Sequence, residues 1–477
     1  MNGITLSTIG AGALALCTAA VAVAGGNDGD LDTTFAFHGR FTYAIGSGPG
    51  DSSNDQVFAA AVQGDGKIVI VGSSLAQAGD KDFHITRIGS DGNLDPAFAN
   101  GNGTLTPGFD FGGTNDDVAR AVAIQADGKI VVAGEVAGSQ SGSGPGPGIG
   151  LLRLMPDGTL DTAFGPNGDG TVYYTPNDGF PLDVNAVVVA DDGSLLVAGA
   201  IMGSNNKDFF VEHFTAGGDT IGFRLIAFDL GGDDNDVATA AVIRPNGKLL
   251  IAGYAARGGG NVDCALVQLL PPEFVATDDG FGNNGDGTRL VAFDIGGDDA
   301  DFCHALALQP DGKILIGGGA AKDASGGTYA AIARLNGGGG QLDDTFAGNG
   351  KLTTFFESAA MGAVNSVRAI AIQSDRKIVL TGYGTTLDSA RAPYDFAAMR
   401  VLENGTLDGT FEGSTPGSNF ATTMIDFNGN DDRAFAGVLE GGRVVAAGQA
   451  KFADGSSNEI AAVRLTADLI FEDSFDP

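Results

Sequence analysis

The sequence is poor in the residues that most often carry chemistry. It has no tryptophan, three cysteines and four histidines, and its 26 lysines and arginines are outnumbered by 59 aspartates and glutamates. A phosphate backbone would be repelled by the formal net charge of −33, so the composition disfavours nucleic acids and anionic membrane surfaces as partners. The same acidity favours a soluble surface and, where carboxylates cluster, divalent cations.

Recognised catalytic motifs are absent as well. The histidines stand at different positions of the repeats described below, and they form no HExxH or other metal-spaced pair. They are His38, His84, His213 and His304. No Gly-x-Ser-x-Gly elbow stands between a strand and a helix pattern, and the glycine-rich run 139–150 lacks the Lys-Ser/Thr ending of a P-loop. The sequence therefore predicts no catalytic and no cofactor-binding residues.

A long apolar run occurs only at the N-terminus. Residues 1–24 carry no charge, and Ala22-Val23-Ala24 forms a small-x-small site before the chain turns polar and acidic. We therefore expect residues 1–24 to be a secretory signal peptide, and the mature chain to be secreted, periplasmic or at the cell surface, with no membrane span. The n-region lacks Lys and Arg, which leaves an uncleaved membrane helix open, whereas lipidation at Cys17 fits poorly because Leu16 precedes it.

Two cysteines, Cys264 and Cys303, remain after the signal peptide. Two thiols in an exported chain can form a disulfide, but both lie among apolar residues of expected strands. Cysteines in such surroundings behave as small packed hydrophobes. We expect them to be packed and unpaired.

The chain is dominated by an internal repeat. The stretch Ala121 to Gly134, AVAIQADGKIVVAG, has the pattern of two apolar strands joined by a tight turn at Asp127-Gly128. The hairpin occurs seven times, at steps of 62, 65, 54, 65, 64 and 66 residues. Its turn residues are Asp65, Asp127, Asp192, Asn246, Asp311, Asp375 and Gly441. Such a period marks a unit that must stack on its neighbours to bury its core.

Each unit contains four short strands, as at 171–175, 184–190, 195–199 and 208–214. Seven four-stranded repeats of about 62 residues predict an all-β fold, a single seven-bladed β-propeller over residues 31–466, followed by a short tail at 467–477. A solenoid is the main rival, but solenoid repeats run only about 20 to 45 residues. Because the first unit begins with its own Leu31-Asp32 boundary, we expect every blade to be one continuous stretch.

Two polar columns accompany the repeat. The boundary motif Leu-Asp-x-x-Phe supplies one of them, with Asp32, Asp95, Asp161, Asp343 and Asp408. The last strand of the unit supplies the other, with Arg87, Arg153, His213, Gln268, Arg334, Arg400 and Arg464. Their fixed offsets predict Asp–Arg pairs between adjacent blades, which would set the register of the blades and carry no chemistry.

The motifs recur in one order at one spacing. The series LDxxFG, DxAxAVAIQPDGKIVVAG and DFAxARL resembles the delta-60 repeat of exported bacterial proteins. The match is carried by Asp117 to Gly134, by Leu306 to Gly318 and by the boundary motifs, and it covers roughly residues 31–466. The units at Asn246 and Gly441 depart most from it. The resemblance implies a propeller-like array and no defined activity.

Acidic turns form the one recurrent polar constellation. Four such turns join the first strand of a unit to its hairpin, at Asp110/Asn115/Asp116/Asp117, Asp229/Asp233/Asp234/Asp236, Asp294/Asp298/Asp299/Asp301 and Asp426/Asn430/Asp431/Asp432. Ca²⁺ takes six to eight oxygen ligands and suits irregular loops, which makes the second and third turns candidate Ca²⁺ sites. The spacing is not that of an EF-hand, however, and Asp and Asn also shape turns through hydrogen bonds to the backbone.

Two functions remain open. The lack of a catalytic set and the uniform repeats favour an exported, non-enzymatic scaffold that binds an unknown glycan, peptide or protein. The alternative is an extracellular propeller enzyme, a polysaccharide lyase or hydrolase, which requires acidic residues or a metal at the ring axis. Binding or catalysis would be expected where the repeats deviate from their consensus, provided that these stretches share one face of the molecule. The deviating stretches are Phe180-Pro181, Pro271-Pro272-Glu273 and Tyr383 to Tyr394.

Overall fold

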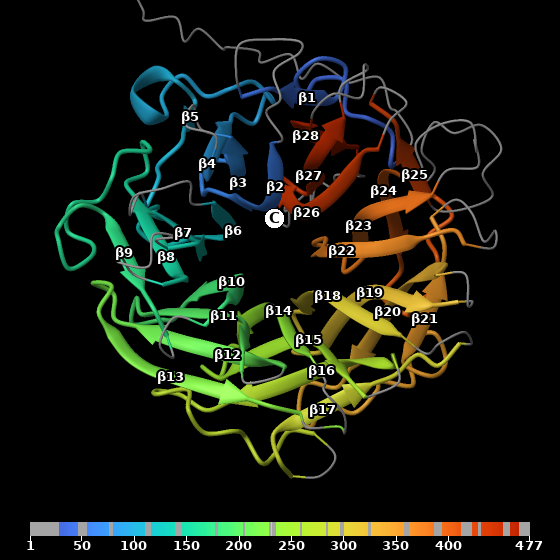
Figure 1. Ribbon diagram of the computed structural model, residues 1–477. Coiled ribbons are helices and arrows are strands. Elements are labelled where there is room, and N and C mark those ends of the chain that lie inside the picture. Colours follow the sequence, from blue (N-terminus) through green and yellow to red (C-terminus); the bar gives the residue numbers. More distant parts are fainter. Residues whose placement is uncertain are drawn as a thin grey trace, which may run out of the picture.

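The repeated hairpins are the inner strands of seven four-stranded antiparallel sheets, which stand around one axis as the blades of a β-propeller (Figure 1). The predicted all-β, seven-bladed fold is therefore confirmed. The computed structural model describes residues 28–45, 55–75, 80–109, 116–138, 146–176, 180–203, 206–228, 230, 235–257, 260–282, 285–295, 300–322, 326–356, 362–385, 394–411, 422–427, 431–451 and 458–466. The predicted signal peptide and the tail at 467–477 lie outside these residues.

Each blade runs from an innermost strand at the axis to an outermost strand at the rim, and the blades are numbered 1 to 7 in the chain order of their innermost strands. The innermost strands are β2 (Gln56–Val62), β6 (Asp117–Ile124), β10 (Leu182–Val189), β14 (Asp236–Ile243), β18 (Asp301–Leu308), β22 (Asn365–Ile372) and β26 (Arg433–Glu440). The second strands are β3 (Ile68–Leu75), β7 (Ile130–Val136), β11 (Leu195–Met202), β15 (Leu249–Ala256), β19 (Ile314–Ala321), β23 (Ile378–Thr385) and β27 (Arg443–Lys451).

The outer half of each blade completes the sheet. The third strands are β4 (Lys81–Ile88), β8 (Gly148–Leu154), β12 (Lys207–Phe214), β16 (Val262–Leu269), β20 (Thr328–Leu335), β24 (Tyr394–Val401) and β28 (Asn458–Leu465). The outermost strands are β5 (Thr104–Leu105), β9 (Thr171–Tyr174), β13 (Thr220–Ile226), β17 (Thr288–Val291), β21 (Lys351–Thr354), β25 (Thr422–Ile425) and β1 (Arg40–Tyr43). Among the described residues the single helix is a 3-10 turn, η1 (Ala99–Gly101). No described helix has the length and apolar character to span a membrane.

The two ends of the chain close the ring together. β1 pairs antiparallel with β28, from Arg40 opposite Val463 to Tyr43 opposite Ile460, so the N-terminal segment supplies the rim strand of the last blade (Figure 1). The expectation of seven continuous blades was wrong. The Leu-Asp-x-x-Phe boundary lies between the third and fourth strands of a blade, so the strand that follows the motif belongs to the preceding blade. Leu31-Asp32 therefore belongs to blade 7.

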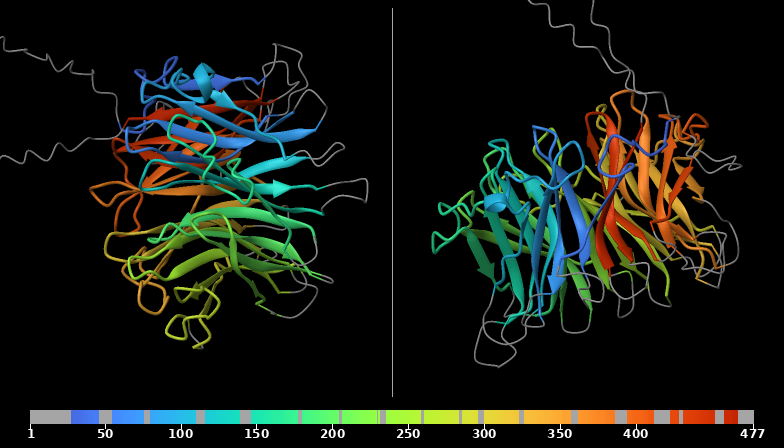
Figure 2. Two further views of the ribbon diagram at one scale, coloured as in Figure 1. Left: turned by 90° about the vertical axis from the view of Figure 1, so that its left-hand side faces the viewer. Right: turned by 90° about the horizontal axis from the view of Figure 1, so that it is seen from above.

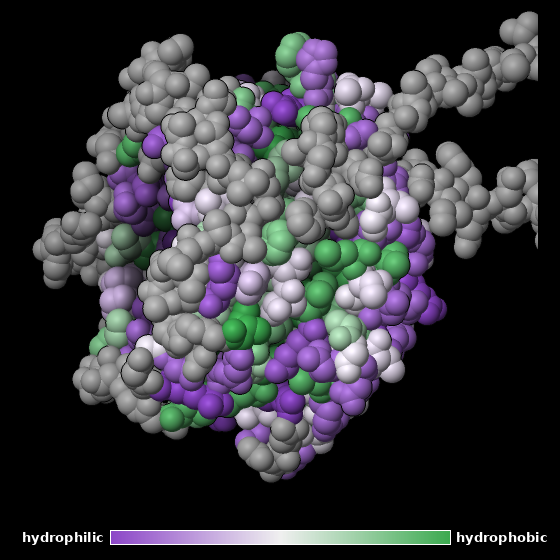
Figure 3. Space-filling model, turned by 90° about the vertical axis from the view of Figure 1, so that its right-hand side faces the viewer, coloured by the Kyte–Doolittle hydropathy of each residue, from purple (hydrophilic) through white to green (hydrophobic). Residues whose placement is uncertain are grey.

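The hydrophobic core is divided among the seven junctions between blades. Each of seven clusters of buried apolar side chains joins residues of two neighbouring sheets, which stand side by side in both views of Figure 2. In β7 every side chain from Ile130 to Ala133 is fully buried. Both faces of the inner strands are covered, which explains why their apolar runs are continuous. At the rim, apolar and polar residues are interspersed on the side that carries β21 and β25 (Figure 3).

The boundary motif and the arginine column form a clamp. In blade 5, Arg334 Nε lies 2.7 Å from Asp343 Oδ2, and its guanidinium stands 4.8 Å from the ring centre of Phe346. Asp343 and Phe346 are the Asp and Phe of one Leu-Asp-x-x-Phe motif. Burial works to raise the pKa of Asp343, but hydrogen bonds from Thr345 and Lys313 and the charge of Arg334 outweigh it and hold the pKa below its usual value.

The expectation that the Asp–Arg pairs join adjacent blades was wrong. The same Arg–Asp pair recurs at Arg87–Asp95, Arg153–Asp161, Arg400–Asp408 and Arg464–Asp32, at 2.7 to 2.9 Å. Each pair lies within one blade. In four of the five pairs the link to the next blade is made by Nη1 of the arginine, which donates to a backbone carbonyl there, whereas Nη2 of Arg400 donates to Asp28 Oδ2 at 2.5 Å. Arg153 donates to Ala216 at 2.6 Å, and Arg334 donates to Glu403.

Blade 4 has no arginine at the position of the arginine column, but a guanidinium from another position still links it to the next blade. Gln268 stands in the arginine position, and Arg244 at the end of the innermost strand supplies the guanidinium instead. Arg244 Nη1 donates to Gln268 Oε1 at 2.5 Å, and its Nη2 donates to the Gly337 carbonyl of the next blade. In blade 1 the same two positions hold Gln63 and Arg87, 3.0 Å apart. The departure of the fourth unit is therefore an exchange of Gln and Arg.

A disulfide joins blades 4 and 5. Cys264 on β16 and Cys303 on β18 are bonded, with their Cα atoms 5.2 Å apart. The expectation of packed, unpaired cysteines was wrong. The third strand of one blade faces the innermost strand of the next across their shared apolar cluster, and this contact brings together two residues that are 39 positions apart.

We expect Arg334→Gln to lower the free energy of unfolding by about 3 kcal/mol, because it leaves the buried Asp343 with Lys313 as its remaining cation. Arg376→Gln is the matched control. The Arg376–Glu403 pair is about half exposed on both sides, at 56% and 47%, and its loss should cost less than about 1 kcal/mol. Urea titration of both variants measures these free energies of unfolding. Equal losses in the two variants would contradict a stabilising role of the Arg334–Asp343 pair.

A buried carboxyl in blade 3 gives the fold a pH dependence. Glu212 on β12 is fully buried, and neither carboxyl oxygen has a hydrogen-bond partner among the described residues. Burial raises its pKa from 4.5 to about 8. The equivalent positions in blades 2 and 4 hold Leu152 and Val267.

Between pH 4.5 and about 8 the unfolded chain loses this proton while the folded chain keeps it, so the contribution of Glu212 to stability falls over that window. We expect the stability gained by Glu212→Leu over the unmodified protein to grow from pH 4.5 to about 8 and then to level off. Leu152→Val, at the equivalent position of blade 2, removes no titratable group and should give a stability difference that does not depend on pH in this way. Thermal melts at several pH values measure both differences, and a pH-independent gain for Glu212→Leu would refute the assignment.

Candidate functional site

Every innermost strand carries a β-bulge at the same position. The register of the hairpin shifts by one residue in all seven blades, which leaves one residue of the innermost strand without a partner on the second strand. These bulge residues are Phe58, Arg120, Asn185, Thr239, His304, Arg368 and Phe435. The residues before each of them are buried, whereas the bulge residues are partly exposed. The bulge therefore turns one side chain per blade out of the core.

A glycine opposite each bulge makes it possible. In blade 2, a Cβ on Gly134 would lie 2.0 Å from the Val118 carbonyl oxygen, and in blade 5 a Cβ on Gly318 would lie 1.7 Å from that of Phe302. Gly72, Gly199, Gly253, Gly382 and Gly448 are equally close to a carbonyl, at 1.7 to 2.0 Å. No side chain fits at these distances. The glycine at the end of each KIVVAG-type motif, inside the second strand, is thus required by the bulge on the innermost strand.

The seven bulge residues converge on a cavity at the ring axis. The cavity holds about 360 Å³ and opens to solvent, and all seven residues line it. Four others complete the lining: Glu135, Asp183, Val237 and Tyr254. The innermost strands that surround it are labelled in Figure 1. Because the bulges lie near the start of each strand, the mouth is on the face formed by the connections from one blade to the next, called here the entry face.

One side of the cavity holds a neutralised arginine. Arg120 Nη2 lies 3.3 Å from Glu135 Oε2, and its guanidinium stands 4.0 Å from the ring centre of Phe58. The other carboxyl oxygen of Glu135 accepts the backbone N–H of Val184 at 3.1 Å. Burial raises the pKa of Glu135, and the charge of Arg120 offsets this in part. The charges of Arg120 and Glu135 therefore neutralise each other.

The opposite side holds an arginine among aromatic rings. Arg368 Nη2 donates to the Tyr383 hydroxyl at 2.7 Å, and its guanidinium lies 5.2 and 5.7 Å from the ring centres of Tyr383 and Phe435. Its Nε is buried without a hydrogen-bond partner, and no described carboxylate forms an ion pair with it. Burial, aided by the charge of Arg368, lowers the pKa of His304 well below its usual value, so the imidazole is neutral at neutral pH.

The remaining polar lining is committed to the scaffold. Asn185 Nδ2 donates to the Ala238 carbonyl at 2.8 Å, and Thr239 Oγ1 donates to the Cys303 carbonyl at 2.9 Å. Asp183 pairs with the Lys207 ammonium. The Asn185 and Thr239 contacts join the innermost strands of neighbouring blades, the Asp183–Lys207 pair lies within blade 3, and together they fix the shape of the cavity.

The histidines do not form a site together. His84 is buried on β4 between Thr86 and Thr106, and His213 on β12 contacts Ser194 at 3.1 Å. His38 lies in the loop before β1 at the rim. His304 alone of the four lines the axial cavity.

The deviant stretches do not share one face. Phe180-Pro181 precedes β10, and Tyr383 and Tyr394 stand at the end of β23 and the start of β24, all on the entry face. Pro271-Pro272-Glu273 follows β16 and therefore lies on the opposite face. The condition set for activity at these three stretches is therefore not met, and residues 386–393 lie outside the described part of the chain.

The acidic turns mainly shape the backbone. An aspartate at the head of the innermost strand accepts the backbone N–H of the aromatic residue that opens the turn, as Asp236 does for Phe228 at 2.8 Å and Asp301 for Phe293 at 2.5 Å. Asn365 does the same for Phe356 at 2.9 Å without a charge. This is the turn-shaping role weighed against Ca²⁺. The other candidate ligands, Asp229, Asp233, Asp234, Asp298 and Asp299, lie outside the described residues.

Two of the junctions nevertheless bring three carboxylates together. Asp263, Asp294 and Asp301 meet between blades 4 and 5, and Asp395, Asp426 and Asp432 meet at the equivalent place between blades 6 and 7, with one oxygen of each within 4.8 Å of the others. Burial and the neighbouring carboxylates raise the pKa of Asp301 to about 6 and of Asp432 to about 7. Arg257 pairs with Asp263 at 2.6 Å. Asp263 and Asp395 were not among the residues singled out from the sequence.

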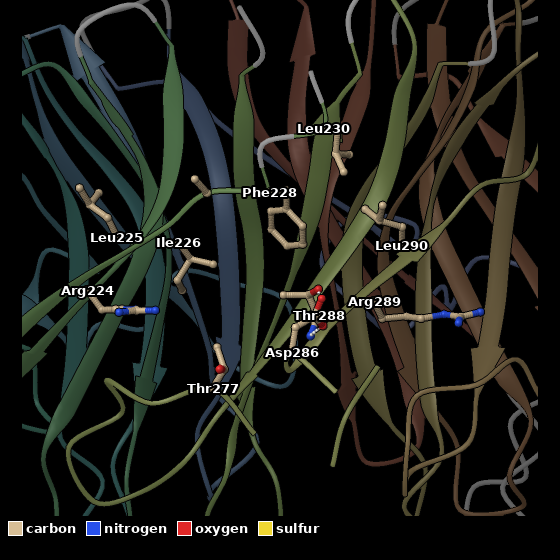
Figure 4. A pocket seen from close by; sticks show the side chains of 11 residues that line it. Arg224, Leu225, Ile226, Phe228, Leu230, Thr277, Asp286, Thr288, Arg289 and Leu290 are labelled. Atoms are coloured by element: carbon tan, nitrogen blue, oxygen red, sulfur yellow. Dashed lines mark hydrogen bonds between the residues drawn. The ribbon is translucent and has the colours of Figure 1, made fainter. Parts of the chain in front are cut away.

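A second hollow lies at the rim between blades 3 and 4. It holds about 580 Å³ between β13 and β17. In Figure 4 Phe228, Leu230 and Leu290 form its apolar part, whereas Arg289 is directed away from Arg224. The two guanidinium groups do not converge, so this groove offers no cluster of chemically matched groups.

Comparisons with known proteins agree with the architecture. Five segments, residues 63–98, 125–164, 244–271, 309–346 and 373–411, match a family model described as "Domain of unknown function (DUF5122) beta-propeller". The match supports a β-propeller repeat family, and the family description carries no activity. No curated protein matches the chain.

Solved structures with a similar fold include proteins of several kinds. A protein of unknown function from Dyadobacter fermentans is 12% identical, with a TM-score of 0.43 over 90% of this chain and 99% of that one. The polysaccharide lyase Uly1 is 12% identical, with a TM-score of 0.48 over 90% and 92%. A Trypanosoma rangeli sialidase is 12% identical, with a TM-score of 0.38 over 86% and 55%. Similarity at this level carries no argument about ligand or activity.

The Ca²⁺ hypothesis remains a prediction, now restricted to the two aspartate trios. Ca²⁺ bound only by the folded protein at a hundred times its Kd would add about 2.7 kcal/mol to stability. We expect Ca²⁺ to raise the melting temperature relative to EDTA, and the double variant Asp294→Asn/Asp426→Asn to abolish that rise. Asp65→Asn, in an exposed turn, is the control and should keep it. A rise of equal size in the double variant would place the ion elsewhere, and no rise in any of the proteins would leave the trios as turn-shaping residues.

Proposed function

We propose that this protein is an exported, non-enzymatic scaffold that binds a glycan through the axial cavity of its propeller. The observation that carries the proposal is the ring of seven bulges. The repeats are alike at their structural positions, yet the one side chain that each blade turns toward the axis is Phe, Arg, Asn, Thr, His, Arg or Phe. A purely structural position would show one residue type, as the facing glycine does.

The lining suits a sugar better than an apolar ligand. Phe58, Phe435 and Tyr254 offer aromatic faces, and polar groups stand between them around the ring. Small-molecule sites combine aromatic walls with a few placed polar groups, in volumes of about 300 to 1,000 Å³. The cavity, at about 360 Å³, holds one or two rings of a glycan chain at its mouth.

A binding role is supported by how many polar groups are already engaged. Glu135, Asp183 and Thr239 hold an arginine, a lysine and a carbonyl respectively. Groups fixed in this way keep a cavity in shape. A general acid or base would instead need its proton-transferring atom directed at the substrate.

An extracellular lyase or hydrolase is the second candidate. The neutral His304 in the same cavity as Arg368 favours a lyase, because a neutral imidazole can accept a proton while a guanidinium neutralises a carboxylate. Glu135, with its raised pKa, and Asp183 are two carboxyls in different environments, as hydrolases use. Incubation with acidic and neutral polysaccharides tests this candidate, since new chain ends that require His304 or Glu135 would replace binding by catalysis.

We expect the purified protein to bind some members of a panel of neutral and acidic oligosaccharides in calorimetry. Phe435→Ala should weaken that binding about 5- to 10-fold, because a stacked aromatic face is lost. Phe37→Ala is the matched control, since Phe37 is 78% exposed at the rim and should leave the affinity unchanged. Binding that survives Phe435→Ala but falls with Phe37→Ala would place the ligand at the rim and contradict the proposal.

A further inference from the structure

One cation that lines the axial cavity has no partner of opposite charge among the described residues. Arg120 is neutralised by Glu135, and Asp183 is neutralised by Lys207. Arg368 has a phenol hydroxyl and two aromatic rings around it, and its Nε is buried without a hydrogen-bond partner among the described residues. Although the protein has a net charge of −33, no described carboxylate forms an ion pair with this guanidinium.

The surroundings of Arg368 hold its guanidinium in one place. Tyr383 accepts a hydrogen bond from it, and the rings of Tyr383 and Phe435 stand beside it. Arg433 stands behind this group, 5.4 Å from the Tyr383 ring centre and 3.3 Å from Asp431. A planar guanidinium fixed in this manner is suited to bidentate recognition of an oxyanion.

The charges of the cavity select the kind of anion. Glu135 and Asp183 line the same cavity but are paired with Arg120 and Lys207, so Arg368 is the one lining cation that no described carboxylate neutralises. A single negative charge matches the single unpaired cation. A dianionic phosphate would bring a second charge for which the described lining has no free partner.

We propose that the glycan bound at the axis carries a carboxylate, as in a uronic acid residue, and that Arg368 binds this carboxylate. The inference rests on the proposed function, since it names the class of ligand for the same cavity. His304, a neutral imidazole beside this group, is placed to share a hydrogen bond with the ligand, and Phe435 and Phe58 are placed to cover the sugar ring. Because the cavity holds only about 360 Å³, we take the residue bound to be a terminal one.

The test uses a matched pair of ligands. An oligosaccharide that ends in glucuronate is compared with the same oligosaccharide after its carboxyl group has been reduced to a hydroxymethyl group, and glucose 6-phosphate is the third probe. Calorimetry should give the glucuronate-ended ligand an affinity about 10- to 100-fold higher than the reduced one, as expected for a hydrogen bond to a charged group. Glucose 6-phosphate should bind more weakly than the glucuronate-ended ligand.

Variants assign the effect to one side chain. Arg368→Gln should bind the glucuronate-ended ligand as weakly as the reduced one, and Arg368→Lys, which keeps the charge but loses the planar fork, should lie between them. Arg376→Gln, in a turn on the opposite face, is the control for a lost guanidinium. Melting temperatures identify a variant that fails to fold, and the comparison of the two ligands on the unmodified protein does not depend on any variant.

Three other outcomes would each overturn a different part of the proposal. Equal binding of both ligands, lost in Phe435→Ala, would overturn the carboxylate inference and leave the axial glycan site in place. Preference for glucose 6-phosphate would replace the carboxylate by a phosphate. Absence of binding to every sugar would overturn the proposed function together with the inference.

Discussion

The close approach between a bulged carbonyl and a glycine is the constraint on which the structure depends. In every blade the carbonyl of the residue two before the bulge lies where a Cβ on the second strand would be, at 1.7 to 2.0 Å. The glycine permits the bulge, and the bulge turns one side chain from the core to the axis. Without the glycine the hairpin would pair in register, and that side chain would be forced back between the blades.

This arrangement separates the scaffold from the site. Three features are nearly the same in each repeat, because every blade packs against its neighbours in the same way. They are the clamp of Arg, Asp and Phe, the turn-shaping aspartates and the glycines. Where one member changes, its neighbour changes with it, as Arg244 and Gln268 show. The bulge residues make no contact that all seven blades share, and their identity differs from blade to blade. A ring of seven side chains of five types on a uniform frame is therefore the part of the molecule in which we propose that specificity resides.

The fold could be predicted from the sequence because its signal is periodic. Seven hairpins at a steady spacing leave few alternatives to a ring. The closure could not be predicted, because β1 has the same short pattern as the other rim strands and pairs with a segment more than 400 residues away. The disulfide was missed for a related reason, since Cys264 and Cys303 become neighbours only across a junction between blades. Contacts between repeats are invisible to reasoning that treats each repeat alone.

The axial site was missed although its signal was present. In the series around Phe58, Arg120 and Asn185, one variable position stands between small or apolar residues, opposite an unvarying glycine. Read as a strand, this pattern suggests an outward-facing residue of no consequence. Read as a bulge, it marks the residue that faces the axis. The acidic turns drew attention instead because they are rich in charge, yet Asn365 performs the same turn-shaping role without one.

Because the chain contains no tryptophan, a single one introduced at a bulge would report on the axis alone. The most direct measurement is the fluorescence of Phe435→Trp during titration with an acidic oligosaccharide, with Phe37→Trp at the exposed rim as the reference. We expect a saturable change in emission for Phe435→Trp and none for Phe37→Trp. A change confined to Phe37→Trp would show that the ligand binds at the rim, and the ring of bulges would then be a feature of the scaffold without a role in binding.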